Sequence, residues 1–195
     1  MGKIFCLMGK SASGKDTVYK ELLTDKDLKL KKIVPYTTRP IRENESNGVQ
    51  YYFTDLDGMK ALEATGKVIE SRAYNTVHGI WYYFTVDDHQ IDLTKGNYII
   101  IGTPENISKL CDYFGSDVVV PIYIELDDGV RLERALSRER MQDNPKYEEM
   151  CRRFLADAKD FDEENLTGIG KSNRFANDDL ATCVKNIQSF IAGNI

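Results

Sequence analysis

The sequence predicts an α/β fold in which helices flank a central parallel sheet, with an inserted lobe and a helical lid. Short apolar runs, such as "KIFCLM" and "NYIIIG", alternate with helical patterns along the chain. Strands that are apolar throughout are typical of parallel sheets, because helices cover both faces of the sheet. Between residues 36 and 86 this alternation gives way to denser strands rich in aromatic residues. The sequence therefore predicts one domain of 195 residues with a lobe inserted into its core.

The elements of the core follow one another in chain order. A strand over 3–8 ends at a glycine-rich loop, and a helix begins near Gly14. The helix expected over 104–115 has Pro at its start and Gly at its end, which is the usual arrangement. The remaining core elements are expected as strands over 30–34, 97–102, 117–126 and 173–177 and as helices over 86–96 and 179–193.

The lobe and the lid each occupy one continuous segment of the sequence. The lobe is expected to hold strands over 49–54, 66–74 and 77–85 and a helix over 55–66. From Asp128 to about Glu164 the pattern indicates two long polar helices broken around "DNP". The chain is therefore divided into a core (1–35, 87–126 and 165–195), a lobe (36–86) and a lid (127–164).

Composition and charge exclude several classes of function. The net charge of −5 disfavours a general nucleic-acid binder, because such proteins are usually basic. A local basic cleft for a small anionic substrate is still compatible with it. No apolar run approaches the roughly 18 residues that span a membrane. The four cysteines form no C-x-x-C pair, so the sequence indicates neither a zinc site nor a disulfide framework, and we expect a reducing, cytoplasmic compartment.

The stretch "GKSASGKD", from Gly9 to Asp16, has the spacing of a phosphate-binding loop, G-x-x-x-x-G-K, between a strand and a helix. The backbone N–H groups of such a loop surround a phosphate, and the helix dipole adds positive potential. The amine of Lys15 would reach the β- and γ-oxygens of a nucleotide. The usual next residue is Ser or Thr, whose hydroxyl holds Mg²⁺, but here it is Asp16. The expected phosphate-binding residues are Gly9, Lys10, Ser11, Ala12, Ser13, Gly14, Lys15, Asp16 and Thr17.

A second anion site is expected where the lobe begins. The segment "YTTRPIRENESNGVQYYF" holds two arginines, a glycine turn and several tyrosines within a short stretch. The guanidinium groups of Arg39 and Arg42 can each bind a phosphate through two parallel hydrogen bonds. Either arginine alone is typical of a surface charge, whereas the two together, downstream of a phosphate-binding loop, favour an anion site.

These motifs resemble those of the guanylate kinase family. That family carries G-x-S-x-S-G-K, T-T-R-x-x-R, G-x-x-Y-x-F, an I-E pair and G-x-Y-Y. This chain has "GKSASGK", "TTRPIR", "GVQYYF", "VIE" and "GIWYY" in the same order and at similar intervals. The resemblance extends to "ANDDL" and so spans nearly the whole chain. It implies an enzyme that transfers the γ-phosphoryl group of ATP, with Mg²⁺, to a nucleoside monophosphate, GMP or dGMP.

The resemblance also implies roles for residues of the lobe. Arg39, Arg42, Tyr51 and Tyr82 would hold the phosphate of the acceptor nucleotide. Glu70 would accept hydrogen bonds from N1–H and the N2 amino group of guanine, whereas adenine has an acceptor at N1 and no amino group at C2. An alternative for Glu70 is a solvated strand carboxylate. The expected acceptor-binding residues are Tyr36, Arg39, Arg42, Tyr51, Glu70, Tyr82, Phe84 and Thr103.

The arginines of the lid match the family to different degrees. Arg134, Arg138 and Arg153 match the family's lid positions best and, with Lys15, are the expected catalytic residues. A lid is useful because phosphoryl transfer must exclude water and neutralise charge on the transferred group. Asn177 would face the adenine of ATP and complete the ATP-binding set. A second set of arginines is equally compatible with a solvated helix face: Arg131, Arg140 and Arg152.

Three positions depart from the family in the base pocket. The family often has a serine before T-T-R, a serine or similar small residue after G-x-Y-Y-G, and an aspartate past the strand that follows the lobe. The corresponding places in this chain hold Pro35, Phe84 and Thr103. Of the family's residues that contact guanine, Glu70 remains. The specificity for guanine is therefore expected to be relaxed.

A further departure concerns the metal. Guanylate kinases usually carry acidic residues at the end of the strand that matches "NYIIIG", whereas this chain has Ile101 and Gly102 there. A carboxylate is thus missing at the strand end and present in the loop, at Asp16. One carboxylate, together with substrate phosphates and waters, is enough to hold Mg²⁺. We expect Asp16 to be the Mg²⁺ ligand, either directly or through water.

Two alternatives stay open at this point. Ribose 1,5-bisphosphate kinases, relatives with the same fold, also have G-K-D and no acid on that strand, but "TTRPIR", Tyr51 and Glu70 favour a nucleotide acceptor. Some guanylate-kinase-like domains are binding modules without catalysis, and their mark is a degraded phosphate loop, whereas Gly9, Gly14 and Lys15 are intact here. The expected partners are small-molecule nucleotides, without nucleic acid or membrane, for a monomer or homodimer.

Overall fold

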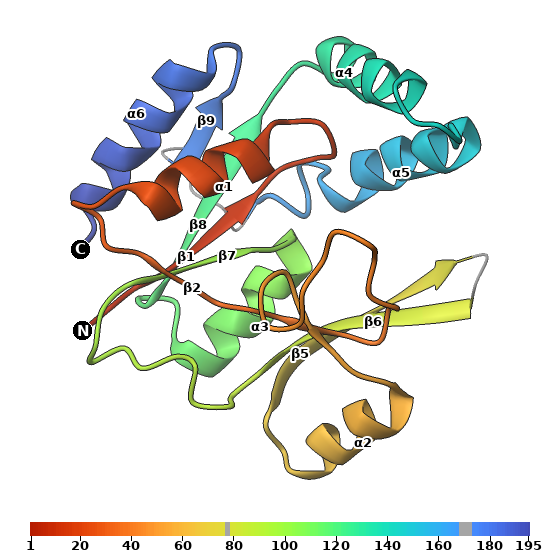
Figure 1. Ribbon diagram of the computed structural model, residues 1–195. Coiled ribbons are helices and arrows are strands. Elements are labelled where there is room, and N and C mark those ends of the chain that lie inside the picture. The colour runs from red at the N-terminus through yellow and green to blue at the C-terminus, as the bar shows by residue number, and fades with distance from the viewer. Residues whose placement is uncertain (77–78, 168–172) are drawn as a thin grey trace.

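The computed structural model describes residues 1–76, 79–167 and 173–195 and has the predicted α/β architecture (Figure 1). In the described residues, the central sheet has five strands in the order β2-β7-β1-β8-β9, and every neighbouring pair is parallel. These strands are β1 (Ile4–Met8), β2 (Lys31–Lys32), β7 (Tyr98–Ile101), β8 (Val119–Glu125) and β9 (Arg174–Ala176). The carboxyl end of β1, in the middle of the sheet, leads into the glycine-rich loop, which is where parallel α/β sheets bind their ligands.

Helices cover both faces of this sheet. Phe5 and Leu7 of β1 face α1 (Lys15–Thr24) and α6 (Leu180–Ala192), which pack against each other above the sheet in Figure 1. Ile4, Cys6 and Met8 face the opposite way, toward α3 (Pro104–Phe114). All five β1 side chains are fully buried, and each apolar side chain of this size contributes about 1.5–3 kcal/mol on burial. The strand that carries the loop is therefore held rigidly.

The inserted lobe has its own sheet, in the order β4-β3-β6-β5. Its elements are β3 (Tyr36–Thr37), β4 (Tyr52–Phe53), α2 (Leu56–Ala64), β5 (Val68–Thr76) and β6 (Gly79–Val86). The first two residues of the strand predicted over 77–85 lie outside the described residues. β5 and β6 are antiparallel partners, and a small apolar cluster lies between this sheet and α2. The lobe therefore has one face turned to its own core and one face available for a site.

The lid consists of α4 (Asp128–Arg140) and α5 (Tyr147–Asp160), which lie on the same side of the molecule as the lobe in Figure 1. None of the residues of α5 is buried. The lid is therefore attached to the core mainly by the polar contacts described below. No helix in the described ranges has the length and apolar character that crossing a membrane requires.

The helix predicted over 86–96 is not formed, and residues 87–97 make turns instead. The carboxylates of Asp88 and Asp92 accept hydrogen bonds from backbone N–H groups two residues further on, which is the Asx-turn pattern. The side chain of Gln90 bonds both backbone groups of Val34, with its amide oxygen 2.7 Å from the nitrogen and its amide nitrogen 3.2 Å from the carbonyl oxygen. Local side-chain-to-backbone bonds therefore outweigh the weak helical pattern here.

Candidate active site

The glycine-rich loop connects β1 to α1 and has the shape of an anion-binding loop. Ala12 and Gly14 are in the left-handed region, with φ of 63° and 88°, and the N–H of Ser13 donates to the carbonyl of Lys10 at 3.1 Å. Successive backbone N–H groups in such turns point into one concavity, and the first turn of α1 adds its dipole. The predicted phosphate-binding loop is therefore present as a backbone structure.

The side chain of Asn177 is hydrogen-bonded to the backbone of this loop. Its Nδ2 donates to the carbonyl of Ser13 at 2.7 Å, and the side chain is 2% exposed. A Cβ added to Gly14 would lie 2.3 Å from that nitrogen, so glycine is required there by close approach as well as by its positive φ. The expectation that Asn177 faces adenine is not supported, because its amide is buried against the loop. It acts on the position of the loop.

Lys15 and Asp16 open α1 at the mouth of the loop. Nζ of Lys15 lies 3.6 Å from Oδ2 of Asp16, and the Asp16 side chain is 71% exposed. At the neighbouring strand end, a Cβ on Gly102 would lie 2.3 Å from Oδ1 of Asn106 and 2.7 Å from Sγ of Cys6. There is thus no room for an acidic side chain at Gly102. Asp16 is an accessible hard oxygen donor beside the loop, which fits Mg²⁺ held jointly by one carboxylate and phosphate oxygens.

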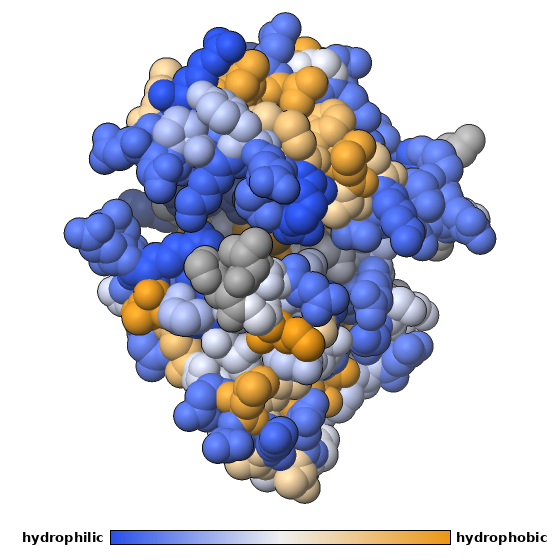
Figure 2. All heavy atoms as spheres, turned by 90° about the vertical axis from the view of Figure 1, so that its right-hand side faces the viewer, coloured by the Kyte–Doolittle hydropathy of each residue, from blue (hydrophilic) through white to orange (hydrophobic). Residues whose placement is uncertain are grey.

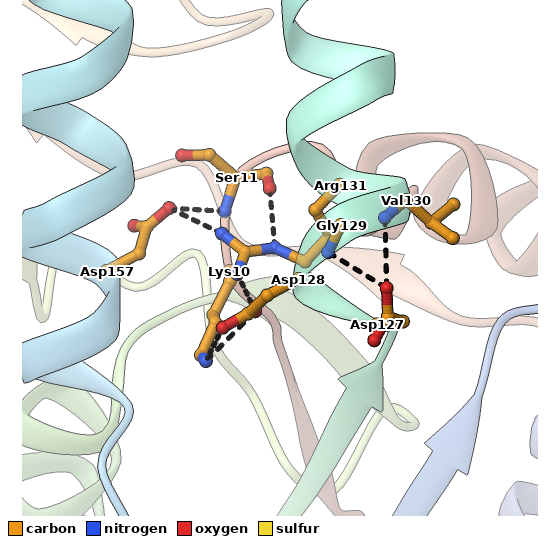
Figure 3. Close-up of polar contacts among 8 residues, drawn as sticks. All are labelled: Lys10, Ser11, Asp127, Asp128, Gly129, Val130, Arg131 and Asp157. Atoms are coloured by element: carbon orange, nitrogen blue, oxygen red, sulfur yellow. Dashed lines mark hydrogen bonds and ion pairs between the residues drawn. The ribbon is translucent and has the colours of Figure 1, made fainter.

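The lid is joined to the loop by a buried arginine (Figure 3). Arg131 is 1% exposed, and its Nε donates to the carbonyl of Ser11 at 3.0 Å. Its two terminal nitrogens meet the carboxylates of Asp128 and Asp157, and its guanidinium lies over the ring of Phe154. Oδ2 of Asp157 also accepts the backbone N–H of Ser11 at 2.6 Å. Of the two interpretations open for Arg131, the solvated helix face is therefore wrong.

The other lid arginines lie nearer the solvent. Arg134 is exposed, with its Nη1 3.9 Å from the point where a Cβ on Gly14 would stand. Nη2 of Arg153 donates to Oγ of Ser11 at 3.4 Å. Arg138 is exposed and follows Arg134 by one turn of α4. Two of the three arginines predicted to be catalytic therefore approach the loop directly.

The lobe gathers a cationic and aromatic cluster opposite the loop. Arg39 is 3% exposed and donates to both carboxylate oxygens of Glu45, at 2.9 and 2.7 Å. Its guanidinium lies 5.5 Å from the ring centroid of Tyr51, whose ring meets that of Tyr83 edge-on. Burial lowers the pKa of Arg39, but Glu45 and Tyr83 outweigh it and raise the pKa above its ordinary value. Arg42 is exposed beside this cluster and retains a solvated side chain.

The lobe cluster and the loop belong to one site. Burial raises the pKa of the Tyr51 hydroxyl; smaller effects come from Tyr83 (raising), from Arg39 and Arg72 (lowering) and from Asp16 (raising). Tyr51 of the lobe is thus within electrostatic range of Asp16 at the loop. Figure 2, which views the molecule from the side of the lid and lobe, shows the surface hollowed between the two, with a mostly hydrophilic rim. The geometry brings the two predicted anion sites close to the same hollow.

Three predicted acceptor residues lie on the wrong face of the lobe. Phe84 is fully buried in the cluster against α2, and Tyr36 and Tyr82 pack against the same cluster. The hydroxyl of Tyr36 donates to Asp88 at 2.7 Å. Because side chains alternate along a strand, Tyr83 and Thr85 of β6 face the site instead. The sequence prediction was therefore displaced by one residue in this strand.

A small polar network joins β5, β6 and the start of α3. Glu70 is buried, accepts the hydroxyl of Thr85 at 2.7 Å on Oε1, and accepts Nε of Arg72 at 3.2 Å on Oε2. Nη1 of Arg72 lies 3.4 Å from the hydroxyl of Thr103, the N-cap of α3. The alternative of a solvated carboxylate at Glu70 is therefore wrong. Sequence reasoning missed Arg72 and Thr85, although Arg72 follows Glu70 by two residues and so shares its face.

Comparisons with known proteins agree with this geometry. The family profile described as guanylate kinase matches residues 1–90. Guanylate kinase of Porphyromonas gingivalis is 28% identical over 194 residues, which cover 98% of this chain and 97% of the relative. Guanylate kinase of Nitrosomonas europaea is 38% identical over 82 residues, 42% of this chain and 39% of the relative. The chain is thus similar to guanylate kinases, at low identity along its whole length and at higher identity over shorter segments.

A solved structure has the same fold as this chain. The crystal structure of guanylate kinase from Anaplasma phagocytophilum superposes with a TM-score of 0.68 at 20% identity, covering 98% of this chain and 85% of that one. The residues that the family profile matches, 1–90, contain the loop, the arginine cluster and Glu70. The predicted α/β fold, with its parallel sheet flanked by helices, is confirmed.

Proposed function

We propose that this protein is an ATP-dependent nucleoside monophosphate kinase that transfers the γ-phosphoryl group of ATP to GMP or dGMP, with relaxed base specificity. The observation that carries the proposal is the pairing of two anion sites across one hollow: the backbone loop with Lys15, and the cluster of Arg39, Tyr51 and Tyr83. One site suits the phosphates of a donor and the other the phosphate of an acceptor. Glu70 at the far end suits a base that donates hydrogen bonds.

The chemistry proposed for this site is positioning and charge stabilisation. Lys15 and the arginines that approach the loop, Arg134 and Arg153, would neutralise charge on the transferred group. The acceptor is a phosphate dianion at neutral pH, so no general base is needed. Mg²⁺, held beside the loop by Asp16 and the donor phosphates, would supply further neutralisation of phosphate charge. The buried contacts of Arg131 keep the lid close to the loop and help to exclude water.

A panel of acceptors tests the proposal. The purified protein is incubated with ATP and Mg²⁺, and ADP formation is measured with GMP, dGMP, AMP and ribose 1,5-bisphosphate as acceptors. We expect turnover with GMP and dGMP. Efficient phosphorylation of ribose 1,5-bisphosphate, with every nucleoside monophosphate ignored, would contradict the proposal. So would ATP binding without turnover of any acceptor, which is the behaviour of a binding module.

A further inference from the structure

The Arg72 guanidinium links β5 to the start of α3. Its Nε is bonded to Glu70 and its Nη1 to Thr103, so it joins the two residues that sequence analysis assigned to the base. Tyr83, in the phosphate cluster, is its cross-strand partner on β6. Arg72 therefore lies between Tyr83 of the proposed phosphate cluster and Thr103 at the start of α3.

Within the Arg72–Glu70 pair, the arginine is the more exposed member. The side chain of Glu70 is 0% exposed and that of Arg72 is 13% exposed. A guanidinium has five N–H donors, and in the described part of the chain the hydrogen bonds of Arg72 account for two of them, at Nε and Nη1. Three N–H groups remain for a ligand. Each carboxylate oxygen of Glu70 already accepts one hydrogen bond and keeps capacity for one more.

We infer that the Arg72–Glu70 pair is the specificity determinant for the acceptor and reads the adjacent C6=O and N1–H groups of a 6-oxopurine monophosphate. Arg72 donates to O6, and Glu70 accepts from N1–H. Adenine has a donor at N6 and an acceptor at N1, so it opposes both partners. This inference rests on the proposed function and adds the base-reading residues and the substrate class, which includes IMP as well as GMP.

The N2 amino group of guanine has a small role in this arrangement. Each oxygen of the buried Glu70 carboxylate already has a partner in the protein, Thr85 on Oε1 and Arg72 on Oε2, so a base without the N2 amino group leaves neither oxygen unpaired. A site built to bind a polar group rejects an analogue without it by about 10⁴-fold or more. We therefore expect IMP, which lacks the N2 amino group, to be used within about tenfold of GMP, since that penalty is absent.

The test is kcat/KM for GMP, IMP and AMP with the wild type and with Arg72→Met. In the wild type we expect AMP to be at least about a hundredfold poorer than GMP. Arg72→Met should lower kcat/KM for GMP and IMP by about 10- to 100-fold, the discrimination typical of one bidentate arginine–base contact, with AMP unchanged. Ser71→Ala, on the next residue and the opposite face of the strand, is the control and should leave all three values unchanged.

Arg72→Met leaves the buried carboxylate of Glu70 without its cationic partner, which can itself destabilise the protein. The double variant Arg72→Met/Glu70→Gln avoids this unpaired carboxylate and serves as a second test. It should also lose the preference for GMP and IMP over AMP. An equal loss for all three nucleotides would overturn the inference, because Arg72 would then act on the shared phosphate or on stability. So would IMP used hundreds of times less well than GMP. If GMP is turned over but Arg72 variants keep the preference, the inference alone fails; if the wild type uses no monophosphate, the proposed function fails too.

Discussion

The two anion sites proposed for the loop and for the lobe would bind a phosphate by different physical means. At the loop, the groups that would meet a phosphate are backbone N–H groups of one continuous segment, and their orientation depends on two left-handed residues and a close contact with Asn177. At the lobe, the groups are side chains from separate segments, held by contacts between aromatic rings and by Glu45. The loop is therefore sensitive to changes in its backbone, whereas the lobe can be altered one side chain at a time.

The largest loss of activity is expected from removing the side chain of Lys15, at the end of the loop. Lys15→Ala should lower kcat by at least about a hundredfold, because one electrostatic partner of the transferred group is removed. The circular dichroism spectrum and the melting temperature should stay close to wild type. Lys20→Ala, exposed on the same helix, is the matched control and should retain full activity. If Lys15→Ala turned over like wild type, the loop would not be the donor site.

Two neighbouring arginines of the lobe, Arg39 and Arg42, are expected to differ in their effect on protein stability, although both affect acceptor binding. Arg39→Ala should raise the KM for the acceptor about 30-fold, as loss of a charge-assisted bidentate contact predicts, with little change in the KM for ATP. It should also lower the free energy of unfolding by roughly 3 kcal/mol, since Glu45 loses its buried partner.

Arg42→Ala is the matched variant, because Arg42 is exposed. It should raise the acceptor KM by about tenfold and leave the unfolding transition measured in urea unchanged. Unchanged acceptor kinetics in both variants would mean that the acceptor's phosphate binds elsewhere. The comparison thus shows whether the lobe can lose affinity without losing its fold.

The same difference explains which parts of the site the sequence could predict. The loop was predicted residue by residue, because contiguous backbone atoms build it and the spacing of Gly9, Gly14 and Lys15 is enough to recognise it. The lobe required a decision on which strand face meets the ligand, and a shift of one residue exchanges the faces. The pattern "GIWYYFT" is compatible with either face of the strand. The sequence predicts Tyr82 and Phe84 on the site face, whereas the structure has Tyr83 and Thr85 on that face.

Other features required tertiary contacts that no local pattern contains. The arginine spacing on α4 does not indicate that Arg131 is buried by a carboxylate from α5 and a carbonyl from the loop. Nor does the sequence show that Cys6 and Asn106 fill the space beside Gly102. The core strands β1, β7 and β8, in contrast, were predicted correctly because apolar runs have few alternatives to burial.

Asp16 provides a test of the loop that does not involve its backbone. Asp16→Asn should raise the Mg²⁺ concentration for half-maximal rate about tenfold, since an amide is a weaker ligand than a carboxylate for a hard cation. The KM for the acceptor should stay unchanged at saturating Mg²⁺. Glu21→Gln, an exposed acid further along α1, is the control. An unaltered Mg²⁺ dependence would remove Asp16 from the metal site.

A smaller effect should distinguish the two faces of β6. Tyr83→Phe removes a hydroxyl beside Arg39 and should raise the acceptor KM about fivefold, which corresponds to about 1 kcal/mol for one hydrogen bond. Tyr82→Phe, one residue away and on the side of the lobe's own core, should leave that KM unchanged. The two variants have the same chemistry, so the comparison reports only which face meets the acceptor. The reverse result would restore the register that the sequence first indicated.

The smallest effect is expected where the lid meets the loop. Burial raises the pKa of Asp128, but Arg131 and Lys10 outweigh it and leave that pKa below its ordinary value. The lowered pKa means that this contact stabilises the docked lid fully above the ordinary carboxyl pKa and is lost as the pH falls through the lowered value. At neutral pH the lid is therefore docked, and its stability depends on single polar contacts.

Asp157→Asn should weaken this docking without unfolding the core. The amide that replaces the carboxylate accepts less strongly from the N–H of Ser11 and no longer neutralises Arg131, and a contact of this kind contributes about 1 kcal/mol. Hydrogen exchange should become several-fold faster in α5, which has no buried residue, and stay unchanged in β1. Glu148→Gln, exposed at the start of the same helix, should exchange like wild type. If α5 in Asp157→Asn kept its wild-type exchange rate, contacts other than those with the loop would hold the lid in place. The position of the lid would then not depend on the loop.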